Sequence, residues 1–247
     1  IALPFHPSKA YTIHEFNARA AELLAGVEAE ARERFPKCRP DLLSRITPRG
    51  VQATQGIIAG CAGGMYDNIR EAAAILREGA IGNDEFSLSV YPTSVPVSLA
   101  LTRDGTSAEL LSDGALIKPS FCGPCFGAGD VPANNGLSLR HTTRNFPNRE
   151  GSKPGEGQLS AVALMDARSI AATARNGGVI TAATDIDYEY EEKPYTFDAS
   201  VYEKRVYNGW GHPHPEAELI LGPNITDWPR QYPLSEHLLL SLCAVIH

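Results

Sequence analysis

The sequence predicts an α/β fold, a three-layer α/β/α sandwich with a mainly parallel sheet. Short apolar or β-branched runs bounded by glycine alternate with apolar residues at helical spacing, and this alternation continues to about residue 184. Strands that alternate with helices are typical of a parallel sheet covered on both faces. Ligands of such sheets bind beyond the carboxyl ends of the strands.

Capping signals and glycine stops define the elements in chain order. Thr12–Glu15 and Thr106–Glu109 have the pattern of capping boxes, and Asp67 can cap the helix that follows it. The predicted helices cover 13–35, 68–78, 95–103, a short segment ending at Gly114, and 167–175. The predicted strands cover 50–60, 86–91, 137–143 and 179–183, and a short lead 115–117 enters the next turn.

Cysteine and arginine side chains follow the predicted strands. Cys61 comes directly after strand 50–60, and Arg144 comes directly after strand 137–143. The turn Cys122-Gly123-Pro124-Cys125 follows the lead 115–117. Because the carboxyl ends of parallel strands share one edge of a sheet, we expect these residues to meet there.

The last quarter of the sequence differs in composition. From about Asp185 it is rich in Tyr, Glu, Pro and Trp. We therefore expect two parts: residues 1–184 as an α/β domain with an N-terminal helix, and residues 185–247 as an irregular extension that leads to a missing domain. The start at Ile1 and the apolar final segment suggest a piece of a longer protein.

Composition excludes several functional classes. The formal charge of −7 and the lack of a long Lys/Arg run argue against a nucleic-acid partner. No apolar segment reaches the roughly 18 to 20 residues that span a bilayer, and no signal-peptide pattern opens the chain, so we expect a cytoplasmic protein without a membrane partner. Five cysteines are an odd number, and a chain of 247 residues is too long to need disulfide bonds for its stability, so a disulfide scaffold is not expected. Two of them are interpreted as small buried residues: Cys38 and Cys243.

The Cys122–Cys125 motif has three common interpretations: a redox dithiol, half of a zinc site, or part of an iron–sulphur site. Spacing alone does not choose among them. A dithiol oxidoreductase would not need Cys61 or the paired arginines Arg144 and Arg149. A zinc site would need a fourth ligand, for which the candidates are His141, His212 and His214.

Three stretches, 60–68, 122–127 and 142–149, resemble in that order the three signature stretches of the aconitase family. The likeness runs through about residues 50–180 and covers only the family's cluster-bearing third domain. The opening residues 1–7 and the Pro-rich tail are similar to those of bacterial aconitase-like hydratases.

The resemblance implies a [4Fe-4S] cluster held by Cys61, Cys122 and Cys125. Three cysteines leave one iron without a protein ligand, and that iron would activate the hydroxyl of a hydroxy-di- or tricarboxylate. Arg144 and Arg149 match the family's two substrate-binding arginines in this domain. A guanidinium group suits a carboxylate because it donates two parallel hydrogen bonds.

The resemblance also implies that the chain is incomplete as a catalyst. The family's serine base lies in a C-terminal swivel domain and its acid histidines lie in N-terminal domains, without counterparts here, so we expect no catalytic residue in this chain and no turnover by it alone. Ala62-Gly63 stands where the family usually has Thr-Asn, and Thr143 where it usually has Asn. These departures motivate a second hypothesis, a non-catalytic domain without a cluster that serves in assembly or regulation.

Overall fold

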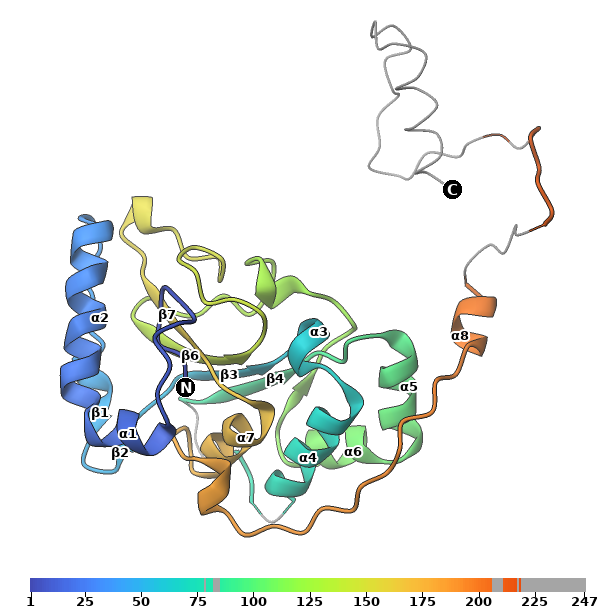
Figure 1. Ribbon diagram of the computed structural model, residues 1–247, viewed down its shortest axis with the longest axis horizontal. Helices are drawn as coiled ribbons and strands as arrows, with labels where there is room; N and C mark the ends of the chain where they lie inside the picture. Colours follow the sequence, from blue (N-terminus) through green and yellow to red (C-terminus); the bar gives the residue numbers. More distant parts are fainter. Residues whose placement is uncertain (78, 82–84, 206–210, 217, 219–247) are drawn as a thin grey trace, which may run out of the picture. The chain divides into compact units, whose positions relative to one another are not determined.

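The computed structural model describes residues 1–77, 79–81, 85–205, 211–216 and 218 (Figure 1). The chain divides into two compact units, Ile1–Lys204 and Arg205–His247. Nearly all of the second unit, including Cys243, lies outside the described residues. The fold described below is therefore that of the first unit.

The centre of this unit is a five-stranded sheet in the order β5-β4-β3-β6-β7, in which every neighbouring pair is parallel. Its strands are β3 (Gln55–Ile58), β4 (Ser87–Val90), β5 (Leu116–Ile117), β6 (Gly136–His141) and β7 (Ser160–Leu164). A separate antiparallel pair consists of β1 (Ile46–Thr47) and β2 (Gly50–Val51). The predicted α/β class with a parallel sheet is confirmed.

Helices flank the sheet, and Figure 1 shows α4, α6 and α7 together on one side of it. The helices are α1 (Ile13–Ala18), α2 (Ala20–Arg34), α3 (Gly60–Gly63), α4 (Tyr66–Leu76), α5 (Val95–Arg103), α6 (Thr106–Ser112), α7 (Ala167–Arg175) and α8 (Ser200–Glu203). Short 3₁₀ turns cover Leu43–Arg45, Gly123–Cys125, Pro154–Glu156 and Ala183–Asp185. No described helix is long and apolar enough to cross a membrane.

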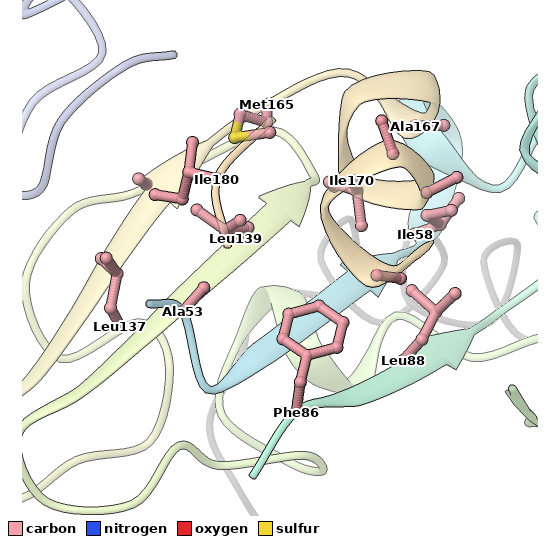
Figure 2. Close-up of a cluster of buried hydrophobic side chains, with 14 of the residues drawn as sticks. Ala53, Ile58, Phe86, Leu88, Leu137, Leu139, Met165, Ala167, Ile170 and Ile180 are labelled. Carbon is pink, nitrogen blue, oxygen red and sulfur yellow. The ribbon is translucent and has the colours of Figure 1, made fainter. Parts of the chain in front are cut away.

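The main core lies between the sheet and α7. Figure 2 shows Ile170 of α7 above the sheet, with Leu139 of β6 and Leu88 of β4 on either side. Gly56 of β3 permits this approach, because a Cβ there would lie 2.8 Å from both Ile170 and Phe86. The sheet therefore presents a continuous apolar face to the helix.

The opposite face of the sheet carries a different layer, made by the connections after β5 and β6. Ile57, Ala59 and Tyr91 form a small separate apolar cluster. Beside this cluster, Arg140 of β6 is buried and donates hydrogen bonds to backbone carbonyl groups of the connection 118–135. The sheet thus separates an apolar helical layer from a more polar layer of loops and short 3₁₀ turns.

Two predicted helix starts were wrong. Asp67 lies inside α4, whose N-cap residue is Met65 and has no side-chain capping bond. Thr106 is the first residue of α6 rather than its cap, because Gly105 provides the turn with φ +90° and Asp104 accepts the Thr106 N–H. In both places the chain direction is fixed by the preceding turn, which replaces the expected capping side chain.

Other boundaries differ from the predictions. The helix predicted over 13–35 is interrupted at Arg19, which leaves helical geometry with φ −116° and ψ 21°. The run 50–60 divides into β2 and β3, because the Ala53 N–H binds the Gly178 carbonyl instead of a strand partner. The strand predicted over 179–183 is wrong, since Val179 forms only an isolated bridge. The strand β7 was not predicted.

Residues 186–199 contain no helix or strand and pack along α4 and α5. The Tyr188 hydroxyl donates to Glu71 at 2.8 Å, and the rings of Tyr195 and Tyr66 lie 5.4 Å apart. Arg103 forms an ion pair with Asp198 at 2.7 Å. These contacts hold the segment on the first unit up to α8.

Replacing Ile170 with alanine should destabilise the fold by about 2–5 kcal/mol, because the side chain is fully buried and its loss leaves a cavity against the sheet. Urea unfolding monitored by circular dichroism measures this change. Leu111→Ala is the control, since Leu111 is 59% exposed and its loss should cost about 0.5 kcal/mol or less. Equal losses in both variants would contradict this account of the core.

Candidate active site at the carboxyl edge of the sheet

Parallel pairing brings the chain to one edge after each strand. Ile58, the last residue of β3, pairs with His141, the last residue of β6, and with Val90, the last residue of β4. The segments that follow β3 and β6 therefore leave the sheet side by side. The first segment contains Cys61 and the second contains Arg144.

The cysteines of the CGPC turn lie beside the start of α3. Gly60 has φ +70°, and a Cβ on it would lie 3.2 Å from the Cys125 sulphur and 3.6 Å from the Cys122 sulphur. Both sulphurs are thus adjacent to the residue that precedes Cys61. Cys61 and Cys122 are exposed, whereas Cys125 is partly buried, and all three are free thiols. The positive φ and the two nearby sulphurs together require a glycine at this position.

The Cys125 thiol is affected both by burial and by the other two cysteines. Burial raises the pKa of the Cys125 thiol, and the neighbouring Cys122 and Cys61 raise it further. A hydrogen bond from the backbone of Thr143 acts in the opposite direction. Bringing several thiolates together is unfavourable without a positive charge, so this group of thiols is chemically suited to a cationic metal centre.

Three thiols are a donor set of the kind that an iron–sulphur cluster takes. Within the described part of the chain, no three His, Cys, Asp or Glu side chains form a group that could hold one ion. In a [4Fe-4S] cluster the thiolates bind different irons, so the sulphurs need not meet at one point. His141, a candidate zinc ligand, accepts the Ala167 N–H with Nδ1. His212 and His214 are exposed and belong to the second unit.

Arg144 and Arg149 lie in the loop after β6, and both are exposed. Among the interactions of the described residues, neither guanidinium group has a hydrogen bond or an ion pair. Asn145 fixes the loop between them: it is 2% exposed, and its Nδ2 donates to the Leu3 carbonyl at 2.6 Å. The Phe5 N–H in turn donates to the Asn145 carbonyl. The loop backbone is anchored while the charged groups are left available to an anion.

The structure shows the contacts at two positions, Gly63 and Thr143, where the sequence departs from the expected motif. A Cβ on Gly63 would lie 2.1 Å from the His141 carbonyl oxygen, so this backbone leaves no room for a side chain there. Thr143 is exposed and offers its backbone, rather than its side chain, to Cys125.

One site residue was missed from the sequence. Arg140 is 1% exposed and lies behind the CGPC turn, where its Nη1 donates to the Pro124 carbonyl at 2.6 Å. Burial lowers the pKa of Arg140 to about 10, and the carboxylates of Glu150 and Asp130 oppose that shift. One signal could have identified it: Arg140 lies in a predicted strand of a sheet covered on both faces. Arginine is rarely fully buried without partners, so an arginine there indicates specific hydrogen bonds.

The chain is similar to proteins of one family. The model of the aconitase family (aconitate hydratase) matches residues 1–172. The large subunit 1 of 3-isopropylmalate dehydratase from Methanopyrus kandleri is 35% identical over 122 residues, which cover 49% of this chain and 29% of that protein. The corresponding large subunit from Oleidesulfovibrio alaskensis is 31% identical over 53% of this chain and 32% of its own length. Mitochondrial homoaconitase from Eremothecium gossypii is 30% identical over 52% of this chain and 19% of its own. The chain thus spans about a third or less of the length of these relatives.

Asn145→Ala should loosen the loop after β6 without unfolding the domain, because it removes both side-chain bonds to the N-terminal segment. We expect trypsin to cleave after the exposed Arg149 several-fold faster, about the effect of losing one or two buried hydrogen bonds. Mass spectrometry of timed digests measures this rate. Asn176→Ala is the control, since Asn176 makes its side-chain bonds at the surface. Unchanged cleavage after Arg149 would contradict the anchoring role of Asn145.

Proposed function

The chain belongs to the aconitase family, and we propose that it is the cluster-binding domain of an aconitase-like hydro-lyase, a hydratase or dehydratase of hydroxy-di- or tricarboxylates. The observation that carries this proposal is the approach of the Cys122 and Cys125 sulphurs to Gly60, directly beside Cys61. Cys61 is thus close to the CGPC thiols, which favours a cluster over a dithiol oxidoreductase, for which Cys61 would be dispensable.

In this proposal Cys61, Cys122 and Cys125 hold a [4Fe-4S] cluster. When bound, the cluster supplies an open iron that acts as a Lewis acid on the substrate hydroxyl. The chain's own residues provide the thiolates, and Gly60 lets the Cys122 and Cys125 sulphurs approach the residue before Cys61. The exposure of Cys61 and Cys122 leaves one side of the thiol group accessible, as substrate entry requires.

Arg144 and Arg149 bind carboxylates of the substrate. Two observations support this role. Among the described residues neither guanidinium group has a competing ion pair, and the loop that carries both arginines is anchored. A fixed guanidinium group can orient a carboxylate through two parallel hydrogen bonds and so place the hydroxyl of the same molecule toward the thiol group.

The names of the relatives indicate a class of substrate. They include 3-isopropylmalate dehydratase, and homoaconitase is a further relative. We therefore propose that the substrate of the protein that contains this chain is a small hydroxy-polycarboxylate. We also propose that this protein acts in the cytoplasm.

The proposal also concerns the rest of the protein. Residues 1–184 form the cluster-binding domain, and residues 185–247 lead to a C-terminal swivel domain. That domain and N-terminal domains supply the groups that move protons, so the isolated chain does not turn over.

Anaerobic reconstitution of the chain should give about four irons per molecule and a broad absorbance near ~400 nm. Cys61→Ala should lower both strongly, because it removes one of the three proposed thiolate ligands. Iron analysis and visible spectroscopy measure the change. Cys38→Ala is the matched control, since Cys38 is 2% exposed and binds the backbone near Pro154 instead. Full iron content in Cys61→Ala would refute the assignment of Cys61 as a ligand.

Arg144→Lys in the full-length protein should lower kcat/KM about tenfold or more, because an ammonium group cannot form the paired hydrogen bonds to a carboxylate. Steady-state hydration assays with unsaturated polycarboxylates measure this effect. Arg103→Lys is the control, since Arg103 pairs with Asp198 on the surface of α5. A reconstituted wild-type protein that hydrates no compound in a broad panel would instead support the non-catalytic alternative.

A further inference from the structure

Arg140 is a buried cation on the side of β6 that faces the CGPC turn. It is 1% exposed, so its guanidinium group depends on protein partners for its hydrogen bonds. Nε donates to Ser138 Oγ at 3.0 Å, and Nη2 lies 3.4 Å from Gln55 Oε1. These two side chains hold the guanidinium group against β3 and β6. Its remaining donors point into the loop above the sheet.

One of these donors reaches the turn between the two cysteines. Arg140 Nη1 donates to the Pro124 carbonyl at 2.6 Å, the shorter of its two bonds to the loop backbone. Within the turn, short-range bonds run from the Cys125 N–H to the Cys122 carbonyl and from the Phe126 N–H to the Gly123 carbonyl. Such bonds fix the shape of the turn but not its position on the sheet. That position is fixed by the bond from Arg140 to the Pro124 carbonyl, together with the backbone contact of Thr143 with Cys125.

The far end of the loop is held by the same guanidinium group. Nη2 donates to the Asp130 carbonyl at 3.0 Å, and Gln55 Nε2 donates to the same oxygen at 3.1 Å. The Tyr91 hydroxyl binds the Asp130 carboxylate at 2.7 Å. Arg140 therefore spans the loop from Pro124 to Asp130 and joins both ends to the sheet.

The surroundings of the Arg140 guanidinium group also favour a contact with the CGPC turn. Burial lowers the pKa of Arg140, and the carboxylate of Glu150, which is 3% exposed in the loop after β6, opposes that shift. The two loops touch directly, because a Cβ on Gly127 would lie 2.6 Å from the Gly151 Cα. The guanidinium group of Arg140 thus places a positive charge directly behind the CGPC turn.

We propose that Arg140 is the positioning residue of the CGPC turn: its two backbone hydrogen bonds fix the loop 124–130 on the sheet and so hold Cys125 beside Gly60. The consequence for iron binding rests on the proposed function, whereas the fixing of the loop does not. The role is indirect, since Arg140 acts through the backbone rather than on substrate.

Alkylation of the reduced, metal-free chain by iodoacetamide, mapped by mass spectrometry, tests this proposal. In Arg140→Gln the partly buried Cys125 should react about tenfold faster or more, the factor expected when a hydrogen bond from a charged donor is lost from the closed loop. Cys61 and the buried Cys38 should react as in the wild type. Arg140→Lys should give an intermediate rate, because it keeps the charge but has a single donor nitrogen in place of three.

Arg77→Gln is the matched control, because it removes an arginine that pairs with Glu109 at the surface. An unchanged Cys125 rate in Arg140→Gln would overturn the proposal. A parallel rise at Cys38 would also overturn it, since Arg140 would then stabilise the whole domain rather than the turn.

Iron content after anaerobic reconstitution separates this inference from the proposed function. Arg140→Gln should bind less iron than both the wild type and Arg77→Gln. Normal iron content despite faster Cys125 alkylation would overturn the link between loop position and iron binding. A wild type that binds no iron, with the Cys125 rates as expected, would refute the cluster and support Arg140 as the residue that positions the turn.

Discussion

The parallel pairing of β3 with β6 is the constraint on which the rest of the structure depends. It aligns Ile58 with His141, so the chain leaves both strands at the same edge. Cys61 and Arg144 are each three residues beyond that pair, in different segments. A shift of one residue in this pairing would turn every side chain of one strand to the other face. It would move Arg140 into the apolar layer and leave the CGPC turn without its contact to the sheet.

The alternation along β6 couples stability to the site. Leu137 and Leu139 lie on the same side of the sheet as α7 (Figure 2), whereas Ser138 and Arg140 face the loop that contains the CGPC turn. The apolar side supplies burial, and the polar side supplies the hydrogen bonds that hold the loop. Burying a guanidinium group is unfavourable unless its donors are satisfied, and here backbone carbonyls and neighbouring side chains satisfy them. The strand that stabilises the core is therefore also the strand that positions the turn.

Local signals and topology determined which features could be predicted. The bounds of α5 and α7 were correct because Ser94 and Asp166 cap them through their own side chains. The gathering of the cysteines at one edge followed from the parallel topology alone. The strand β7 has the sequence Ser-Ala-Val-Ala-Leu and is defined by its pairing with β6, and it was not identified from the sequence. Arg140 was missed for the same reason, since Gln55, Pro124 and Asp130, which accept most of its hydrogen bonds, lie in other segments of the chain.

The two departures from the family motif affect different parts of the site. At Gly63 the backbone lies against the His141 carbonyl, so the side chain usual in the family is replaced by close packing of α3 on β6. At Thr143 the contact with Cys125 comes from the backbone, which any residue can supply. Neither change removes a thiol or a contact that holds one. Each leaves the site without the amide side chain that the family usually has at that position. Under the proposed function, the cysteines can therefore hold a cluster while the substrate contacts differ from those of the relatives.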